Sequence, residues 1–247
     1  MTKHFSPSIT YFDVVDACAQ PGCPICRIAQ HVVHRYLDAI LYEFVTDPGT
    51  RSNLKQSLGY CNEHAWMLPD LPGGYALGIA LIYQDLLQDI GARLNDAHYD
   101  RAPAVSIRRL REALNPLEPV QATRTSVAAL QAGARCPACE HRDTMVEIAL
   151  QSMLEALARG DARMQTGLEA SSGLCLAHLR RAMELSRDQD AFLRLIDISR
   201  KTLHALEQEL QEFIRKCDYR YRDDEHGSEM DSWRRAVAWI AGQQGAL

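Results

Sequence analysis

The 247-residue sequence lacks long apolar runs, a surplus of basic residues, and the glycine and proline content of a turn-rich β protein. Its most apolar stretch, residues 75–87, is broken by Gly78, Gln84 and Asp85, and a membrane span needs about 18 apolar residues. Lys and Arg number 27 against 32 Asp and Glu, for a net charge of −5, which argues against a basic surface for nucleic acid. Membrane and nucleic-acid partners are therefore not expected.

The N-terminus also lacks a basic segment followed by an apolar run of signal-peptide length. We therefore expect a cytoplasmic protein, in which thiols stay reduced and structural disulfides are rare. Eight cysteines are the unusual feature of the composition. In a reducing compartment, clustered cysteines indicate metal ligands or redox groups.

Two motifs occur twice along the chain. The first half contains Cys23-Pro-Ile-Cys26 and Gly59-Tyr-Cys61-Asn-Glu-His64, and the second half contains Cys136-Pro-Ala-Cys139 and Gly173-Leu-Cys175-Leu-Ala-His178. The copies are 113 and 114 positions apart. Apolar residues of the segment 32–45 recur in register at 145–158, in pairs every four residues, as on one face of a helix. A tandem duplication of about 113 residues explains both matches.

Helical periodicity dominates both halves, and no period-two alternation persists long enough to predict a strand. We expect helices near residues 9–17, 27–46, 50–58, from 61, and 75–96, with the same pattern in the second half. A final long helix is expected at 188–219 and a terminal one at 232–241. The predicted organisation is a first metal-binding repeat (1–97), a linker (98–120) with a short helix at 107–114, a second repeat (121–222), and an acidic tail with a terminal helix (223–247).

Each half offers three thiols and one imidazole, the number and type of ligands that a structural zinc site needs. The predicted ligands are Cys23, Cys26, Cys61 and His64 in the first half, and Cys136, Cys139, Cys175 and His178 in the second. A helix from Cys26 to residue 46 rises about 30 Å, and the 15 residue steps from there to Cys61 can span about the same distance. We therefore predict an all-α protein in which a metal pins the base of a helical hairpin in each half. Pairing of the motifs across the halves remains an open alternative.

Two Zn²⁺ ions per chain are the expected cofactors, with an iron–sulfur cluster as the alternative, although such clusters normally take four cysteines. Cys18 and Cys217 have no counterpart in the other half and are interpreted as non-ligands. No phosphate-binding, dinucleotide-binding, zinc-protease or serine-hydrolase motif is present. No catalytic residue can be assigned.

The combination of C-P-x-C and G-[aromatic or Leu]-C-x-x-H in each half resembles a bacterial family of duplicated helical proteins of unknown function. The resemblance covers nearly the whole chain and extends to residues 216–221 and 231–237. Histidine is usual in that family where this chain has Cys217. The resemblance implies the duplicated helical architecture and no specific activity.

Two functional hypotheses follow. A closed four-ligand site leaves no coordination position for chemistry, which favours a non-enzymatic interaction or adaptor protein with a protein partner. The alternative is an iron–sulfur or labile-metal redox protein or enzyme, so the sequence leaves open whether the protein is an enzyme.

Overall fold

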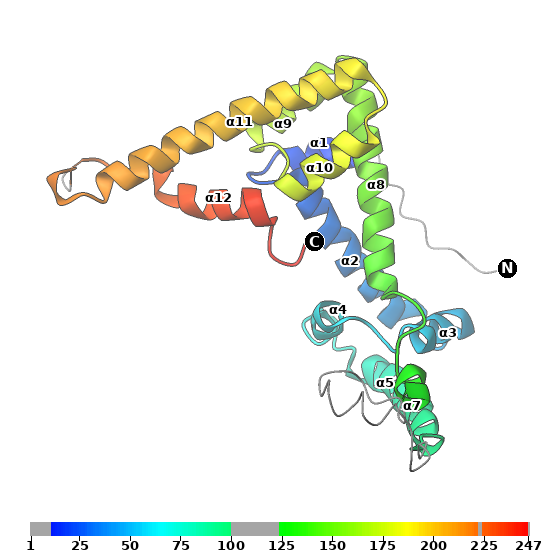
Figure 1. Cartoon of the computed structure of the whole chain (residues 1–247). Coiled ribbons are helices and arrows are strands. Elements are labelled where there is room, and N and C mark those ends of the chain that lie inside the picture. The colour runs from blue at the N-terminus through cyan, green and yellow to red at the C-terminus, as the bar shows by residue number, and fades with distance from the viewer. Residues whose placement is uncertain (1–10, 100–123, 222–223, 247) are drawn as a thin grey trace, which may run out of the picture. The chain divides into compact units, whose positions relative to one another are not determined.

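The structure, a computed structural model, describes residues 11–99, 124–221 and 224–246. Every regular element in these ranges is helical, which confirms the all-α prediction (Figure 1). The α-helices are α1 (Tyr11–Cys18), α2 (Pro24–Glu43), α3 (Pro48–Gln56), α4 (Asn62–Met67), α5 (Ala76–Asn95), α7 (Arg124–Ala129), α8 (Pro137–Ala158), α9 (Ala162–Ala170), α10 (Leu176–Leu185), α11 (Gln189–Lys216) and α12 (Ser232–Ala241). Two short 3-10 helices, η2 (Tyr219–Tyr221) and η3 (Ser228–Asp231), lie between α11 and α12.

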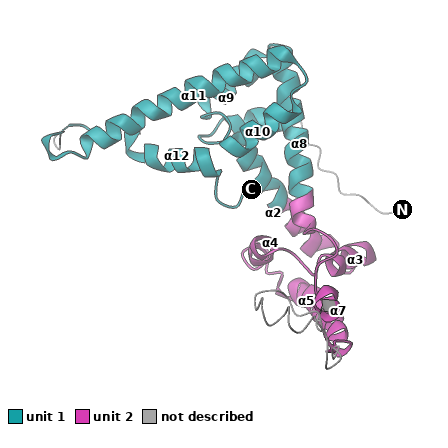
Figure 2. Ribbon diagram, in the orientation of Figure 1, with its two compact units in different colours: residues 1–33, 141–247 teal, residues 34–140 magenta. Residues whose placement is uncertain are grey.

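Two compact units make up the chain (Figure 2). Unit 1 contains residues 1–33 and 141–247, and unit 2 contains residues 34–140. The boundaries fall within α2 and α8, so each of these helices contributes to both units. The units therefore differ from the predicted repeats, 1–97 and 121–222. The short helix predicted at 107–114 lies outside the described residues.

Unit 1 has one large apolar core, which α1, α8, α9, α10 and α11 build together with the start of α2. The apolar stripe predicted at 145–158 faces this core, and Leu150 and Leu157 are fully buried. At the far end of α11, the backbone N–H of Gly227 and the ammonium group of Lys216 donate hydrogen bonds to the carboxylate of Glu229 in η3. These contacts lower the pKa of Glu229 to about 2 and connect α11 to the segment that leads into α12.

Unit 2 is built around the packing of α3 against α5. Leu54 of α3 and Ile82 of α5 are both fully buried. The carboxylate of Asp85 lies 3.2 Å from Arg51 Nη1 and 2.8 Å from Lys55 Nζ, so ion pairs reinforce the same contact. These pairs are partly exposed, and each contributes about 1 kcal/mol or less. Burial of apolar side chains therefore provides most of the stability of this contact.

Most helix boundaries agree with the predictions to within three residues. The helix predicted at 232–241 is observed with the same bounds, and α5 is one residue shorter at each end than predicted. Helix α2 begins at Pro24. Proline is well tolerated at this position, because the backbone N–H that it lacks would have no partner within the helix in the first turn. Pro48 likewise begins α3, and the side chain of Asp47 caps the start of this helix. No described helix, α5 included, is long and apolar enough to cross a membrane.

Candidate metal centres

All eight predicted ligands lie at helix N-termini. Four cysteines directly precede helices, and their carbonyl oxygens accept the first helical hydrogen bond: Cys23 from the N–H of Arg27, Cys61 from Ala65, Cys136 from Glu140, and Cys175 from Leu179. The other four ligands, Cys26, His64, Cys139 and His178, are three residues further along. Each C-x2-C or C-x2-H motif therefore presents its two side chains from the first turn of one helix.

A left-handed turn leads into each C-x2-H motif. Gly59 and Gly173 have φ of +92° and +71°, and their N–H groups bond to the carbonyls of Leu54 and Leu168. A Cβ on Gly59 would lie 3.2 Å from Leu86 Cδ1. Glycine therefore suits both the backbone conformation and the space at this turn. These hydrogen bonds end α3 and α9 and direct the chain toward Cys61 and Cys175.

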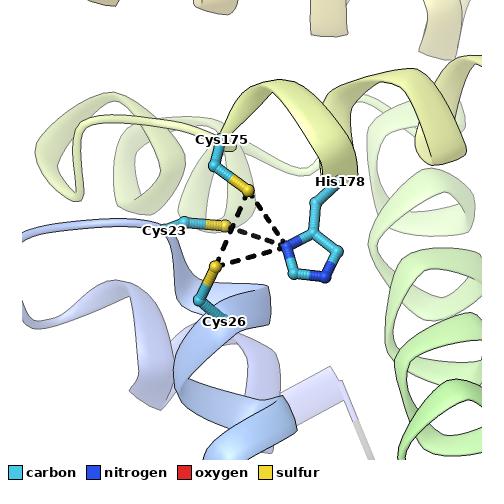
Figure 3. Close-up of side chains that lie close together, drawn as sticks. All are labelled: Cys23, Cys26, Cys175 and His178. Atoms are coloured by element: carbon cyan, nitrogen blue, oxygen red, sulfur yellow. Dashed lines mark hydrogen bonds between the residues drawn. The ribbon is translucent and has the colours of Figure 1, made fainter. Parts of the chain in front are cut away.

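The first quartet consists of Cys23, Cys26, Cys175 and His178, all within unit 1 (Figure 3). The sulfurs of Cys26 and Cys175 are 3.6 Å apart. The Nδ1 atom of His178 points at all three sulfurs, at 3.6 Å from Cys23, 3.4 Å from Cys26 and 3.3 Å from Cys175. All four residues are buried.

The second quartet consists of Cys61, His64, Cys136 and Cys139, all within unit 2. The sulfurs of Cys61 and Cys139 are 3.7 Å apart. The Nδ1 atom of His64 lies 3.2 Å from Cys61, 3.5 Å from Cys136 and 3.4 Å from Cys139. The two quartets therefore have the same donor atoms in nearly the same arrangement.

These distances match the edges of a tetrahedron around one ion. Zinc–sulfur bonds of about 2.3 Å and zinc–nitrogen bonds of about 2.0–2.1 Å place tetrahedral sulfurs about 3.8 Å apart, and sulfur and nitrogen about 3.5–3.6 Å apart. The observed sulfur–sulfur distances are 3.6 and 3.7 Å, and the sulfur–nitrogen distances range from 3.2 to 3.6 Å. In each quartet all four donor atoms lie within 4.8 Å of one another. Each quartet could therefore hold one metal ion.

The thiol pKa values show how unfavourable three thiolates would be in these places without a cation. The hydrogen bond with Cys175 raises the pKa of Cys26 to about 11, and burial raises the pKa of Cys23 well above its usual value. The hydrogen bonds from Cys23 and Cys26 lower the pKa of Cys175, so that one thiolate is shared among three sulfurs. In the second quartet, burial raises the pKa of Cys139 to about 12. A bound divalent cation reverses this preference, because it stabilises each thiolate directly.

The pairing of motifs corrects the predicted sites. The arrangement with Cys23, Cys26, Cys61 and His64 in one site, and Cys136, Cys139, Cys175 and His178 in the other, is wrong. Each C-x2-C motif instead meets the C-x2-H motif of the other half, which is the alternative that the sequence left open. The reason lies in the segment that follows α2. Nine of its residues form α3, which rises only about 14 Å, and a tight turn follows at Gly59. The segment therefore does not bring Cys61 back to Cys23 and Cys26, and Cys61 lies with Cys136 and Cys139 instead.

Contacts near the quartets explain which helix starts meet. The N–H groups of Gly133 and Ala134, just before Cys136, both bond to the carbonyl of Gln56, just before the turn to Cys61. In unit 1, Gly167 of α9 approaches Cys18 of α1 so closely that an added Cβ would lie 3.0 Å from Cys18 Cβ. Helices α1 and α9 each end five residues before a ligand, Cys23 and Cys175 respectively. Each contact therefore brings two ligand-bearing segments together.

Other residues around the quartets carry no signal in the sequence. The backbone N–H of Gln243 donates a hydrogen bond to the sulfur of Cys26, and a backbone donor can belong to any residue type. Tyr36 lies near Cys136, and burial raises its pKa to about 12. Cys18 packs in the core of unit 1, and Cys217 is exposed at the end of α11, so neither joins a quartet, as predicted.

Comparison with known proteins agrees with the resemblance in the sequence. The chain is 22% identical over 232 residues to "Uncharacterized 23.9 kDa protein in xynA 3'region" of Caldicellulosiruptor sp. (strain Rt8B.4), which covers 94% of this chain and all of that protein. No solved structure matches the chain at a significant level. Residues 6–246 match the model of the "Family of unknown function (DUF6062)". The chain therefore belongs to this family.

Proposed function

We propose that the protein binds two structural zinc ions per chain and functions in the cytoplasm as a non-enzymatic interaction protein. The observation that carries the zinc assignment is the fit of both quartets to the edges of a zinc tetrahedron. Three thiolates and one imidazole are ligands that zinc accepts readily. An iron–sulfur cluster fits less well, because such clusters normally take four cysteines and these donors converge on one centre.

Closed coordination favours a structural role for the metal. Four protein ligands complete the tetrahedron, whereas catalytic zinc sites keep one position for water or substrate. Each ion joins the first turns of two helices that are distant in sequence: α2 and α10 in one site, α4 and α8 in the other. Zinc in these places stabilises the fold and supplies no reactive group.

An apolar stripe on α12 supports action through a protein partner. Trp233, Val237 and Ile240 are 46%, 62% and 60% exposed, and their i, i+4, i+7 spacing places them on one face of the helix. Exposed apolar surface of this kind is typical of protein-binding sites. The eight free cysteines support the cytoplasmic location, because thiols stay reduced in that compartment.

Metal analysis combined with X-ray absorption at the zinc edge tests the metal assignment. We expect two zinc ions per chain, each with three sulfurs at about 2.3 Å and one nitrogen at about 2.0–2.1 Å. Fewer than two ions, iron in place of zinc, or an oxygen ligand at either ion would overturn it.

Substitutions on α12 test the interaction role. A purified partner should bind the wild-type protein and should fail to bind a variant with Val237→Lys and Ile240→Lys. The matched control is Val127→Lys, because Val127 is an exposed apolar residue, 51% accessible, on α7 of the other unit. Equal binding of all three proteins would refute a role for this face.

A further inference from the structure

The two quartets differ in how exposed their cysteines are to solvent. In the first quartet Cys23, Cys26 and Cys175 are only 6%, 0% and 1% exposed. In the second quartet Cys61, Cys136 and Cys139 are all partly exposed, although His64 is fully buried. The sets of donor atoms are the same, so this difference in access is what distinguishes the two sites chemically.

Two of these partly exposed cysteines come from different helices and have neighbouring sulfurs. Cys61 Sγ and Cys139 Sγ are 3.7 Å apart and come from the starts of α4 and α8. A disulfide needs a separation of about 2.05 Å, so the sulfurs must approach by less than 2 Å once no ion lies between them. When a small oxidant reacts with one of these two sulfurs, the thiolate of the other cysteine is therefore close enough to form a disulfide with it.

We propose that the second quartet is an oxidation site for hydroperoxides, at which Cys61 and Cys139 form a disulfide and the zinc ion leaves. This inference rests on the proposed zinc binding. The first quartet keeps its ion under the same conditions, because its sulfurs are enclosed. A cavity of about 150 Å³ borders Cys23 and Cys175, but it leaves them almost unexposed.

The chemistry balances with the hydroperoxide as the oxidant. The thiolate of Cys139 or Cys61 attacks the peroxide oxygen and becomes a sulfenic acid, while the O–O bond breaks and the departing alkoxide or hydroxide takes one proton. The second thiolate attacks the sulfenic sulfur, forms the disulfide and expels hydroxide, which takes a second proton to become water. Two electrons pass from the sulfurs to the peroxide. The zinc ion, left with Cys136 and His64, dissociates as Zn²⁺.

The test titrates zinc-loaded full-length protein with hydrogen peroxide under anaerobic conditions. Cys217→Ser serves as the background, because the exposed Cys217 thiol would otherwise consume oxidant. Released zinc is followed with a chromogenic chelator, and disulfides are mapped by mass spectrometry. We expect one of the two zinc ions to be released together with a Cys61–Cys139 disulfide, and one to be retained. A thiol reductant with added zinc should restore two ions.

The outcomes separate this inference from the proposed function. Fewer than two zinc ions before oxidation would overturn zinc binding itself. Two ions that leave at the same rate, or a first disulfide that involves Cys23, Cys26 or Cys175, would overturn the inference and leave the zinc assignment intact. Release of one ion with no disulfide between Cys61 and Cys139 would also contradict it.

Discussion

Complete removal of zinc should unfold unit 2 and leave much of unit 1 folded. The described part of unit 2 buries eight large aliphatic side chains, and at about 1.5–3 kcal/mol each they contribute about 12–24 kcal/mol. These residues are Leu37, Ile40, Leu41, Leu54, Leu68, Leu71, Ile82 and Leu86. Structural zinc contributes about 10–16 kcal/mol in small zinc-binding peptides, which is comparable with that sum.

The ratio of the zinc contribution to the contribution of apolar burial is smaller in unit 1, because its core contains many more buried apolar residues from six helices. Metal loss removes a smaller share of its stabilising free energy. Since a whole domain is stable by only about 5–15 kcal/mol, the loss of a contribution as large as that of zinc exceeds what unit 2 can tolerate.

Hydrogen exchange followed by mass spectrometry measures the two units separately. After a strong chelator has removed both ions, amide protection in α4 and α5 should be lost, while α8 beyond residue 145 and the first half of α11 should stay protected. Zinc added back should restore the protection of unit 2. Loss of protection in unit 1 first, or equal loss in both units, would refute this reasoning, as would a fully protected metal-free protein.

Two further predictions concern packing and pH. Gly167→Ala should lower the free energy of unfolding by about 1–3 kcal/mol, because the added Cβ would crowd Cys18. Gly91→Ala in α5 should raise the free energy of unfolding by up to about 1 kcal/mol, because alanine favours the helix and its Cβ would meet nothing within 4 Å. Denaturant titration of both variants checks that the two changes have opposite signs. The hydrogen bonds from the Gly227 N–H and from Lys216 lower the pKa of Glu229 from 4.5 to about 2, so the stability that these contacts provide is complete above about pH 4.5 and is lost as the pH falls toward 2. Amide protection in α12, measured by hydrogen exchange as a function of pH, should change less between pH 4.5 and 2 in the Glu229→Gln variant than in the wild-type protein. The same pH dependence in both proteins would contradict this role of Glu229.

The sequence predicts local structure and ligand identity in this chain because both depend on short-range patterns. Period-3.6 apolar stripes identify α5 and α8, and a two-residue gap suffices to place Cys23 and Cys26 on one helical turn. Pairing of the motifs is a long-range property. It depends on contacts such as Gly133 with Gln56, for which the sequence carries no pattern.

The length of the chain could not decide the pairing either. The segment between Cys26 and Cys61 is long enough to return to its starting point, but its length alone does not require it to do so. Helix α3 and the turn at Gly59 occupy most of the residues between α2 and Cys61. Only the geometry of these two elements together shows that Cys61 belongs to the site in unit 2. The partial exposure of Cys61 and Cys139 is likewise a property of the packed structure.

Zinc content of paired cysteine variants tests the crosswise quartets most directly. Cys23→Ala with Cys175→Ala removes two ligands of one site, so this variant should retain one zinc ion per chain. Cys23→Ala with Cys61→Ala damages both sites and should retain none. Circular dichroism on both variants shows whether each still folds. The opposite stoichiometry, with one ion retained in the Cys23/Cys61 variant and none in the Cys23/Cys175 variant, would contradict the account.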